Sequence, residues 1–366
     1  MKIIHIQRDN ILSGVQVVTV NEVTDESNDN TNFLICSGPG ILDSFFDTDK
    51  VYHVRELERK ISIFKDLLAF YKILMVLRKV RPDVVHTHST KPGILGRLAA
   101  YVLGIKTVHT VHGYGHMAIR SSLGKRLYSL VEGALSRITT TIIVLSESDF
   151  KIARSLHSSA EVKKITNGVD TKIFRPSKKV ASPKKKAIWI ARVAEQKNPM
   201  LLIEAIKLLK LKNITNLHVD IWGDGPLLGK LEKEIKDNSL SPIVSLRGWA
   251  SDPSSILPKY DLFISTSTYE GMPIALLEAM SSGVYPLVSK IPPHEEVLGA
   301  NFDGLFDSRP HLLESKISAF LNNEFQDFDP RSLILEGYEV RRRNRKVSQL
   351  YSNICNRSAS SMVKNT

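Results

Sequence analysis

Cysteines and long apolar runs are scarce in this sequence, and each shortage excludes a class of protein. The 366 residues include only two cysteines, Cys36 and Cys355, which fit neither a disulfide scaffold nor a metal-binding motif. We therefore expect a reducing compartment. No run approaches the ~20 apolar residues that a membrane-spanning helix needs. The opening MKIIHIQ is followed at once by Arg8 and Asp9, so it predicts a first β-strand rather than a signal peptide.

Acidic residues are also in the minority. The chain has 50 lysines and arginines against 38 aspartates and glutamates, which gives a net charge of +12 and a pI of about 9.5. This surplus indicates a polyanionic partner, and it fits nucleic acid, a phosphorylated substrate or an acidic membrane surface equally well. The length exceeds that of a typical single domain and predicts two domains, each with its own core.

The amino-terminal half alternates short apolar runs with amphipathic segments. Strands are predicted at 1–6, 32–37, 83–88, 106–112 and 139–146, and helices at 56–80, 93–103 and 123–138. Such alternation is typical of a parallel sheet with helices on both faces. We therefore expect a doubly wound α/β domain over residues 1–173.

A second domain of the same class is expected after a linker. Residues 174–186 (FRPSKKVASPKKK) are charged and contain two prolines, which is typical of a linker. Alternation then resumes over 187–332, with strands predicted at 187–192, 217–223, 243–248, 261–266 and 285–289 and a helix at 226–238. In the carboxyl-terminal segment 333–366, residues 333–354 show helical spacing and an arginine–lysine cluster, and we expect residues 362–366 to be disordered.

Two loops of the second domain follow predicted strands and carry charged residues. After the strand 261–266, Pro273 is expected to be the first helical residue and Gly283 to end the helix. Such a loop lies at the carboxyl edge of a parallel sheet, where ligands bind and free helix amides attract phosphate. Glu270 and Glu278 flank this place, and carboxylates accept hydrogen bonds from sugar hydroxyls.

The strand 187–192 is followed by a loop with two cations. Arg192 could bind a phosphate through two hydrogen bonds and Lys197 as a point charge, so together they could hold a diphosphate and neutralise it as it leaves. Gly223 and Gly225, in a G-D-G-P sequence after the strand 217–223, fit a structural turn and a ligand-contacting loop equally well.

The nine residues from Glu270 to Glu278, EGMPIALLE, resemble the signature of glycosyltransferase family 4, which contains retaining enzymes of the GT-B fold. The resemblance implies two Rossmann-like doubly wound domains that face a cleft. It also implies that Arg192 and Lys197 hold the nucleotide diphosphate, that Glu278 binds the ribose and that Glu270 holds the donor sugar.

Further positions match the family pattern less completely. His112, in T-V-H-G, matches a histidine that contacts the donor sugar, although a buried structural histidine is the alternative. The family's glycine loop after the first strand carries two glycines, and only Gly14 is present here. The expected catalytic residues are therefore His112 and Glu270, and the expected nucleotide-sugar-binding residues are Gly14, Arg192, Lys197, Gly223, Gly225, Gly271, Met272, Pro273, Ile274 and Glu278.

A metal site is an alternative interpretation for the first domain, because several histidines lie in it. They are His86, His88, His109, His112 and His116. No cysteine or carboxylate joins them at ligand spacing. The Asp47-Thr48-Asp49 sequence matches a metal-binding motif of another transferase fold, but it lies in a polar loop of the wrong domain. We expect neither a metal nor another cofactor, because cations and helix amides replace a metal in a GT-B enzyme.

The expected reaction transfers a hexose or N-acetylhexosamine from a nucleotide sugar, with a UDP-sugar favoured. Residues 86–100 and T-V-H-G resemble the bacterial surface-polysaccharide branch of the family. This resemblance implies a polyprenyl-diphosphate-linked saccharide acceptor, and a place in O-antigen or capsule biosynthesis. We expect a cytoplasmic protein that is peripherally associated with the inner face of the cytoplasmic membrane.

An apolar stripe in the helix 123–138 has two interpretations. Its members are Leu123, Leu127, Leu130, Val131, Ala134, Leu135 and Ile138, with Lys125, Arg126 and Arg137 interspersed. Such stripes are mostly core, and we favour that interpretation, with docking to an anionic membrane as the alternative. The basic cluster Arg341, Arg342, Arg343, Arg345 and Lys346 could add attraction to anionic lipid.

Three other functions stay open. A GT-B epimerase would interconvert UDP-sugars without an acceptor. A glycoside hydrolase would need two carboxylates astride the bond and would leave Arg192 and Lys197 unexplained. A nucleic-acid-binding protein would explain the charge, but the sequence lacks a face where aromatic and basic residues mix, and we expect no nucleic acid partner.

Overall fold

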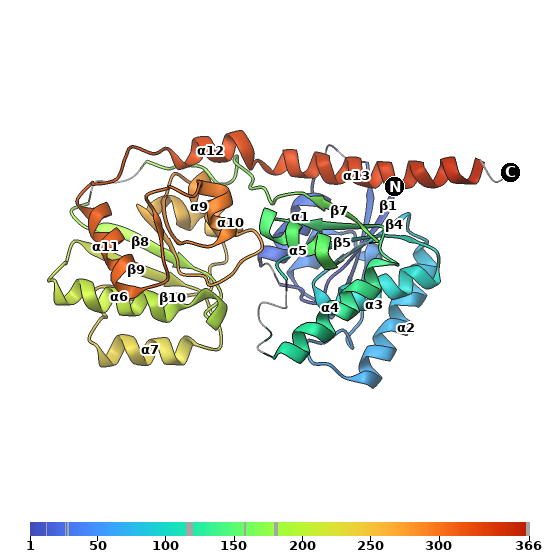
Figure 1. Ribbon diagram of the computed structural model, residues 1–366, viewed down its shortest axis with the longest axis horizontal. Helices are drawn as coiled ribbons and strands as arrows, with labels where there is room; N and C mark the ends of the chain where they lie inside the picture. The colour runs from blue at the N-terminus through green and yellow to red at the C-terminus, as the bar shows by residue number, and fades with distance from the viewer. Residues whose placement is uncertain are drawn as a thin grey trace. The chain divides into compact units, whose positions relative to one another are not determined.

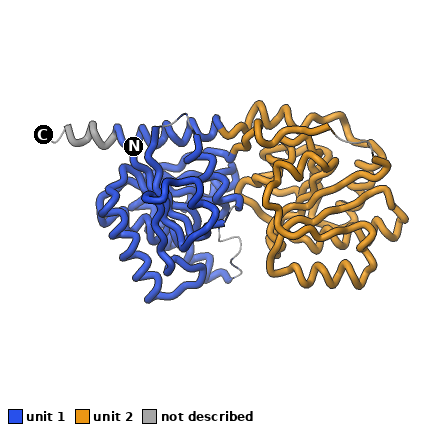
Figure 2. Tube along the Cα trace, turned by 180° about the vertical axis from the view of Figure 1, so that it is seen from behind, with its two compact units in different colours: residues 1–167, 341–366 blue, residues 168–340 orange. Residues whose placement is uncertain are grey.

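The chain forms two compact α/β units, each built around a parallel sheet (Figure 1). The computed structural model describes residues 1–363 except 12, 26, 28, 115–118, 120, 157–158 and 179–181, and it gives side-chain surroundings up to residue 356. Unit 1 contains Met1–Asn167 and Arg341–Thr366, and unit 2 contains Gly168–Val340 (Figure 2). His116 and residues 364–366 of the predicted disordered tail lie outside the described residues.

Unit 1 has a seven-stranded sheet in the order β3-β2-β1-β4-β5-β6-β7, and every neighbouring pair is parallel. The strands are β1 (Lys2–Ile6), β2 (Thr31–Cys36), β3 (Val51–His53), β4 (Val84–His88), β5 (Lys106–Val111), β6 (Thr141–Val144) and β7 (Glu161–Lys164). The helices are α1 (Gly14–Val23), α2 (Ile63–Val80), α3 (Thr90–Val102), α4 (Ser122–Ser136), α5 (Glu147–Leu156) and α13 (Val340–Val363).

Unit 2 has a six-stranded parallel sheet in the order β10-β9-β8-β11-β12-β13. Its strands are β8 (Lys185–Ile190), β9 (Leu217–Trp222), β10 (Val244–Gly248), β11 (Leu262–Ser265), β12 (Tyr285–Ser289) and β13 (Leu305–Phe306). Its helices are α6 (Pro199–Leu211), α7 (Leu228–Asp237), α8 (Pro253–Ile256), α9 (Ile274–Ser281), α10 (Pro292–Leu298), α11 (Pro310–Leu321) and α12 (Pro330–Gly337).

The buried strands form the cores of the two units. In unit 2, Trp189 of β8, Ile221 of β9 and Ile264 of β11 are almost fully buried in one apolar cluster with α6 and α11. In unit 1, Ile4 and Ile6 of β1 pack with the inner face of α2. Each fully buried side chain of this size stabilises the fold by ~1.5–3 kcal/mol.

The strand order reverses once in each sheet, between β1 and β4 in unit 1 and between β8 and β11 in unit 2. Ligands of open α/β sheets bind outside the carboxyl ends of the strands at such a reversal. The loops that follow β8 and β11 are those in which the sequence places Arg192, Lys197 and Glu270. The topology therefore selects the same edge of unit 2 as the sequence motifs.

Most predicted elements are confirmed, but several boundaries differ. The helix expected at 56–80 begins only at Ile63, because Ser62 has extended backbone and serves as the N-cap. The border between the units lies between Asn167 and Gly168, so the segment predicted to be a linker, 174–186, belongs to unit 2. Its last two residues already pair in β8, with Lys186 opposite His218 of β9.

Candidate active site

The loops after β8 and β11 are joined to each other by hydrogen bonds. The backbone amide of Thr268 donates to the Gln196 carbonyl at 2.8 Å, and the Gln196 side-chain amide donates to the Tyr269 carbonyl at 2.9 Å. The Thr266 hydroxyl donates to the Lys197 carbonyl at 2.7 Å. These bonds hold the two charged loops as one structure at the carboxyl edge of the sheet.

Lys197 and Glu270 form an ion pair within this structure. The Lys197 ammonium contacts Oε1 of Glu270, and the Ser267 hydroxyl donates to the same oxygen at 2.7 Å. Burial by itself would raise the pKa of Glu270, but the positive charge and hydrogen bond of Lys197, followed by the Ser267 hydrogen bond, lower it. Glu270 is therefore ionised at neutral pH, and no hydrogen bond from a described residue reaches its Oε2.

Glu278 is a buried carboxyl without a cation. It lies in α9, is 8% exposed, and its side chain has no hydrogen bond or ion pair to any described residue. Burial raises the pKa of Glu278 to about 7. A carboxylate in this state gains from a ligand that supplies hydrogen-bond donors, such as the hydroxyls of a ribose.

Helix α9 begins one residue later than the sequence predicted. Pro273 has extended backbone and is the N-cap, so the first helical residue is Ile274, and no side chain caps the helix. Gly271, Met272, Pro273 and Ile274 are all buried beside this helix start. The first amides of a helix have no partner within the helix, and they favour an anion.

Arg192 is exposed at the end of β8. No hydrogen bond or ion pair joins it, or Glu278, to another site residue in the part of the chain that the structure describes. The structure therefore brings Lys197 and Glu270 into contact and leaves Arg192 and Glu278 available for a ligand.

Gly223 and Gly225 are required by the backbone beside Arg192. A Cβ atom on Gly223 would lie 1.9 Å from the Ala191 carbonyl oxygen, and one on Gly225 would lie 2.4 Å from the Val193 carbonyl oxygen. The Val193 amide also donates to the Asp224 carbonyl at 2.9 Å. Of the two interpretations that the sequence left open, the structural turn is therefore shown, and contact with a ligand stays a prediction.

The sequence missed His294 near this site. It lies in α10, is fully buried, and its Nδ1 is 2.7 Å from the Ser289 carbonyl oxygen, so Nδ1 donates the proton. Burial lowers the pKa of His294 to about 4 although Glu270 acts to raise it. A single histidine between two prolines and two glutamates offers no signal that could have identified it.

In unit 1, Gly14 is the exposed first residue of α1, and His112 directly follows β5. His112 is partly buried, and its Nε2 lies 3.1 Å from Nδ1 of His88. Burial lowers the pKa of His112 to about 3, with smaller contributions from Arg343 and His86. His112 is therefore a neutral imidazole at neutral pH.

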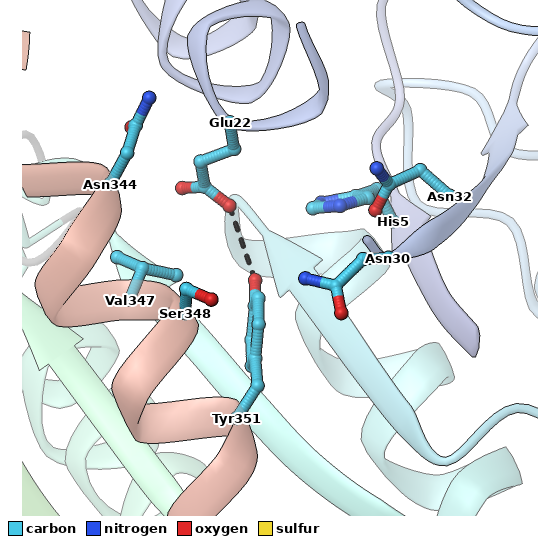
Figure 3. A pocket seen from close by; sticks show the side chains of 8 residues that line it. All are labelled: His5, Glu22, Asn30, Asn32, Asn344, Val347, Ser348 and Tyr351. Atoms are coloured by element: carbon cyan, nitrogen blue, oxygen red, sulfur yellow. Dashed lines mark hydrogen bonds between the residues drawn. The ribbon is translucent and has the colours of Figure 1, made fainter. Parts of the chain in front are cut away.

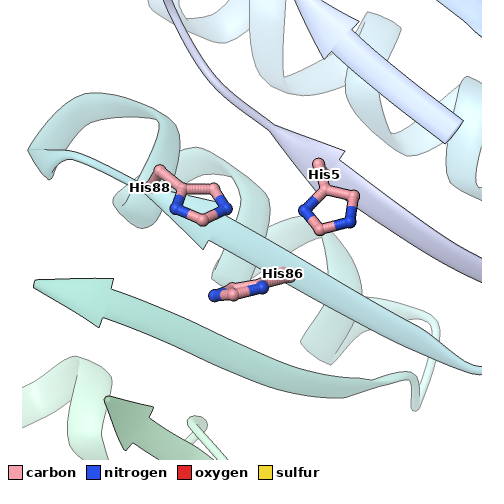
Figure 4. A group of neighbouring side chains, drawn as sticks. All are labelled: His5, His86 and His88. Carbon is pink, nitrogen blue, oxygen red and sulfur yellow. The ribbon is translucent and has the colours of Figure 1, made fainter. Parts of the chain in front are cut away.

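The histidines of unit 1 form a buried group that includes His5, which the sequence analysis did not select. His5, His86 and His88 each have a ring nitrogen within 4.8 Å of the others (Figure 4). His86 already contacts the Tyr351 hydroxyl at 2.5 Å and the Thr110 hydroxyl at 2.7 Å. These hydrogen bonds satisfy both nitrogens of His86 without a metal ion, and that no metal binds here stays a prediction.

Helix α13 contributes to the same buried region. Arg343 contacts Glu22 of α1 at 2.5 Å, and the Tyr351 hydroxyl donates to the other oxygen of Glu22 at 3.1 Å (Figure 3). The prediction that Arg343 contributes to a lipid-binding cluster is therefore wrong, because this guanidinium is buried against a carboxylate. Arg341, Arg342, Arg345 and Lys346 are exposed.

Most of the apolar stripe of α4 is not core, contrary to the favoured interpretation. Leu123 is 74% exposed, Leu127 is 61% and Leu130 is 71%. Of the stripe, Leu135 is buried. Glu132 also lies on the inward face of α4 and forms a buried ion pair with Arg97 of α3 at 3.0 Å. Among the described residues, no helix is long and apolar enough to cross a membrane.

Comparison with known proteins identifies the family. Residues 170–337 match the family described as glycosyl transferases group 1, and residues 34–173 match glycosyltransferase family 4. The chain is 32% identical to an Escherichia coli UDP-Gal:alpha-D-GlcNAc-diphosphoundecaprenol alpha-1,3-galactosyltransferase over 96% of each chain. It is 24% identical to a Xanthomonas oryzae GDP-mannose:cellobiosyl-diphosphopolyprenol alpha-mannosyltransferase over 83% of this chain and 72% of that protein.

A solved structure supports the same fold. Anabaena HepE, in complex with UDP and glucose, has a TM-score of 0.79 and 14% identity, and the match covers 96% of this chain and 99% of that one. The two parallel α/β units, the two family matches and the relative that spans nearly the whole chain agree with one another. The chain belongs to glycosyltransferase family 4 and is a glycosyltransferase of the GT-B fold.

Proposed function

We propose that this glycosyltransferase moves a hexose or N-acetylhexosamine, with retention of configuration, from a UDP-sugar to a saccharide on polyprenyl diphosphate. The observation that carries the proposal is the edge of unit 2, where the Lys197–Glu270 pair lies at the carboxyl ends of β8 and β11. The names of the Escherichia coli and Xanthomonas relatives both specify a diphosphopolyprenol-linked saccharide, which supports the acceptor class. A role in surface polysaccharide synthesis follows from that acceptor.

The proposed roles follow from charge and exposure. The diphosphate binds the exposed Arg192, Lys197 and the uncapped amides at the start of α9. The ribose hydroxyls donate to Glu278, whose carboxyl has no described partner. Glu270 accepts from a hydroxyl of the donor sugar through Oε2. In unit 1, His112 is the residue that we propose to contact a sugar substrate.

In the reaction, the bond between the anomeric carbon and the diphosphate oxygen breaks, and the acceptor hydroxyl oxygen bonds to the same face of that carbon. The hydroxyl proton leaves with the departing UDP. Negative charge grows on the diphosphate in the transition state, and fixed cations and amides stabilise it at no cost of reorganisation. Arg192, Lys197 and the α9 amides supply these charges, so we propose that no metal is required.

A donor and acceptor panel tests this function. UDP-galactose, UDP-glucose, UDP-N-acetylglucosamine and GDP-mannose are each incubated with a synthetic polyprenyl-diphosphate-linked N-acetylglucosamine, with and without EDTA. We expect transfer from one UDP-sugar, an α-linked product by NMR, and no effect of EDTA. Interconversion of UDP-sugars without an acceptor would instead indicate an epimerase, and release of UDP without any saccharide product would contradict transfer to this acceptor.

We also propose that unit 1 docks on the anionic inner face of the cytoplasmic membrane through α2, α3 and α4, which lie side by side (Figure 1). Large apolar side chains are exposed along all three helices, namely Ile63, Phe64, Leu67, Tyr71, Met75, Leu98, Tyr101, Val102, Leu123, Leu127, Leu130 and Val131. Exposed cations lie beside them, including Lys125 and Arg126 on α4. Apolar insertion and attraction of ~1 kcal/mol per suitably placed cation act together at such a surface.

Vesicle sedimentation tests this docking surface. The double variant Leu127→Gln/Leu130→Gln should bind phosphatidylglycerol vesicles at least about 10-fold more weakly than the wild type, because two apolar contacts with lipid are lost. Leu211→Gln is the matched control, because Leu211 is 79% exposed in unit 2. Equal binding of all three proteins would contradict the assignment of this surface.

A further inference from the structure

The loop that follows β10 carries a tryptophan whose indole has no bonding partner among the described residues. Trp249 comes directly after Gly248, the last residue of β10, and it is 51% exposed. The two other tryptophans are engaged, because Nε1 of Trp189 and Nε1 of Trp222 each donate to a hydroxyl oxygen at 3.0 Å. No hydrogen bond or ring contact joins Trp249 to another residue that the structure describes. A large aromatic side chain is therefore available to a ligand at this position.

The loop that carries Trp249 is fixed at both ends. The Gly223 backbone amide donates to the Gly248 carbonyl oxygen at 2.7 Å, and Gly248 has a φ of +71°, which favours glycine. At the other end, the Asp252 carboxylate is the N-cap of α8 and accepts from two amides of its first turn. The backbone around Trp249 is therefore held in place without a ligand.

This loop also lies between the groups that are proposed to hold the diphosphate and the ribose. On one side, Gly223 belongs to the turn that packs against the backbone on both sides of Arg192. On the other side, the 3₁₀ helix η5 (Leu257–Lys259), which follows α8, packs against α9, the helix that contains Glu278. Strand β10 is two strands from β8, which places Trp249 roughly 10 Å along the same carboxyl edge from the Arg192 loop.

The place of the base follows from that of the ribose. In UDP, the uracil and the hydroxyls that are proposed to bind Glu278 are attached to one furanose ring, so the uracil must contact an element beside α9. Proteins bind nucleobases by stacking them on aromatic side chains, and such a contact contributes roughly 5- to 150-fold to affinity. Among the described residues in the loops that follow the strands of unit 2, Trp249 is the most exposed aromatic residue, whereas Tyr269 is partly buried.

We infer that Trp249 is the residue on which the uracil of the donor stacks. This inference rests on the proposed function for the identity of the ligand. The uracil stays bound while the bond between the sugar and the diphosphate breaks, so stacking stabilises the ground state and the transition state equally. Trp249 therefore lowers the KM for the donor and leaves kcat unchanged. Every nucleobase has a π-face, so Trp249 recognises a base, and other groups distinguish uracil from guanine.

Calorimetric titration of full-length protein with UDP and with inorganic pyrophosphate tests the stacking contact. Trp249→Ala should bind UDP roughly 5- to 150-fold more weakly, whereas Trp249→Phe, which keeps a ring, should lose less than about fivefold. Both variants should bind pyrophosphate as the wild type does, because pyrophosphate has no base. Leu211→Ala is the control, since Leu211 is an exposed apolar residue elsewhere in unit 2. Unchanged UDP affinity in Trp249→Ala, or an equal loss for pyrophosphate, would overturn the inference.

Tryptophan fluorescence identifies the ring that contacts the base. An indole stacked on a nucleobase loses emission, so UDP should quench the wild type and Trp222→Phe more strongly than Trp249→Phe, and pyrophosphate should quench none of them. Trp222→Phe is the matched control, because Trp222 ends the neighbouring strand β9 and is also partly exposed. Quenching by UDP that is undiminished in Trp249→Phe would contradict stacking on Trp249.

Steady-state kinetics with the UDP-sugar separate this contact from a structural role. In Trp249→Ala the KM for the donor should rise while kcat stays within about threefold of the wild type. A fall in kcat with an unchanged KM would overturn the inference. Failure of the proposed function is distinguishable: a wild type that does not bind UDP contradicts the proposed function and this inference together, whereas UDP binding that does not depend on Trp249 contradicts this inference alone.

Discussion

At the scale of single residues, Glu278 makes the binding of the donor depend on pH. Its pKa of about 7 is set by burial, and the ionised carboxylate accepts a hydrogen bond from a ribose hydroxyl more strongly than the neutral acid does. UDP-galactose, whose diphosphate does not titrate near neutrality, should bind more tightly at about pH 8 than at about pH 6, by up to about 10-fold, because the ionised fraction rises about 10-fold. Calorimetric titration at both pH values measures this change, and Glu278→Gln should abolish it.

The same residue affects folding with a defined sign. The pKa of Glu278 is raised in the native state, so its protonated form is the one that the fold favours. Stability is lost as the pH rises from the unfolded-state pKa through about 7, by on the order of 3 kcal/mol in total. In urea unfolding, Glu278→Gln should therefore gain stability over the wild type at about pH 8, and the gain should vanish at about pH 4. A gain that does not depend on pH would contradict the raised pKa.

Adding a methyl group at Gly223 should destabilise the loop that contains Arg192. A Cβ atom there meets the Ala191 carbonyl oxygen at 1.9 Å, with φ at +146°. We expect Gly223→Ala to lower the free energy of unfolding by about 2 kcal/mol or more, because backbone must move. Gly229→Ala is the control, since a Cβ atom on Gly229 of α7 meets nothing within 4 Å and alanine favours a helix. Equal effects of the two substitutions in urea unfolding would contradict this description of the loop.

At the scale of elements, α13 is held to unit 1 by a buried ion pair. Arg343 contacts Glu22, and both side chains are at most 5% exposed. Arg343→Met should destabilise unit 1 by roughly 3–5 kcal/mol, because it leaves a buried carboxylate without its cation. Arg345→Met, on the exposed side of the same helix, should change stability by less than about 0.5 kcal/mol. Equal melting temperatures for Arg343→Met and Arg345→Met would show that the Arg343–Glu22 ion pair does not stabilise the packing of α13.

The elements that the sequence predicted well are those with a clear period and clear ends. β11, α9 and β12 were predicted because an apolar run, a proline and a glycine mark the boundaries within residues 261–289. Helix α1 was missed because Val15, Val17, Val18, Thr19 and Val20 are β-branched and favour a strand. The stripe of α4 shows a different limit: a periodic pattern identifies the apolar face of a helix, but it does not show whether protein covers that face.

The candidate site could be predicted only in part. Motifs located Arg192, Lys197, Glu270 and Glu278 individually, but spacing gave no sign that Lys197 and Glu270, which are 73 residues apart, form one ion pair. The Thr19 hydroxyl lies 3.4 Å from Nε2 of His88, whose Nδ1 lies 3.1 Å from Nε2 of His112. These contacts join α1, β4 and the residue after β5, so they depend on the order of strands in the sheet. Residues without a motif, such as His5 and His294, could be found only from their positions in the structure.

At the scale of the whole molecule, the account requires unit 2 to bind the nucleotide through its carboxyl edge. Unit 2 contains Arg192, Lys197, Glu270 and Glu278. The hydrogen bonds between the two charged loops hold this edge in place without help from a ligand. UDP alone should therefore bind to the intact protein in the absence of an acceptor saccharide.

The most direct test is the dissociation constant of UDP for the wild type, Arg192→Ala and Arg309→Ala, measured by isothermal titration calorimetry in EDTA. Arg309 is an exposed arginine elsewhere in unit 2 and serves as the control. The account predicts binding without metal, a loss of at least about 10-fold in Arg192→Ala because a charge-assisted phosphate contact is removed, and no change in Arg309→Ala. Unchanged UDP affinity in Arg192→Ala would contradict the central claim.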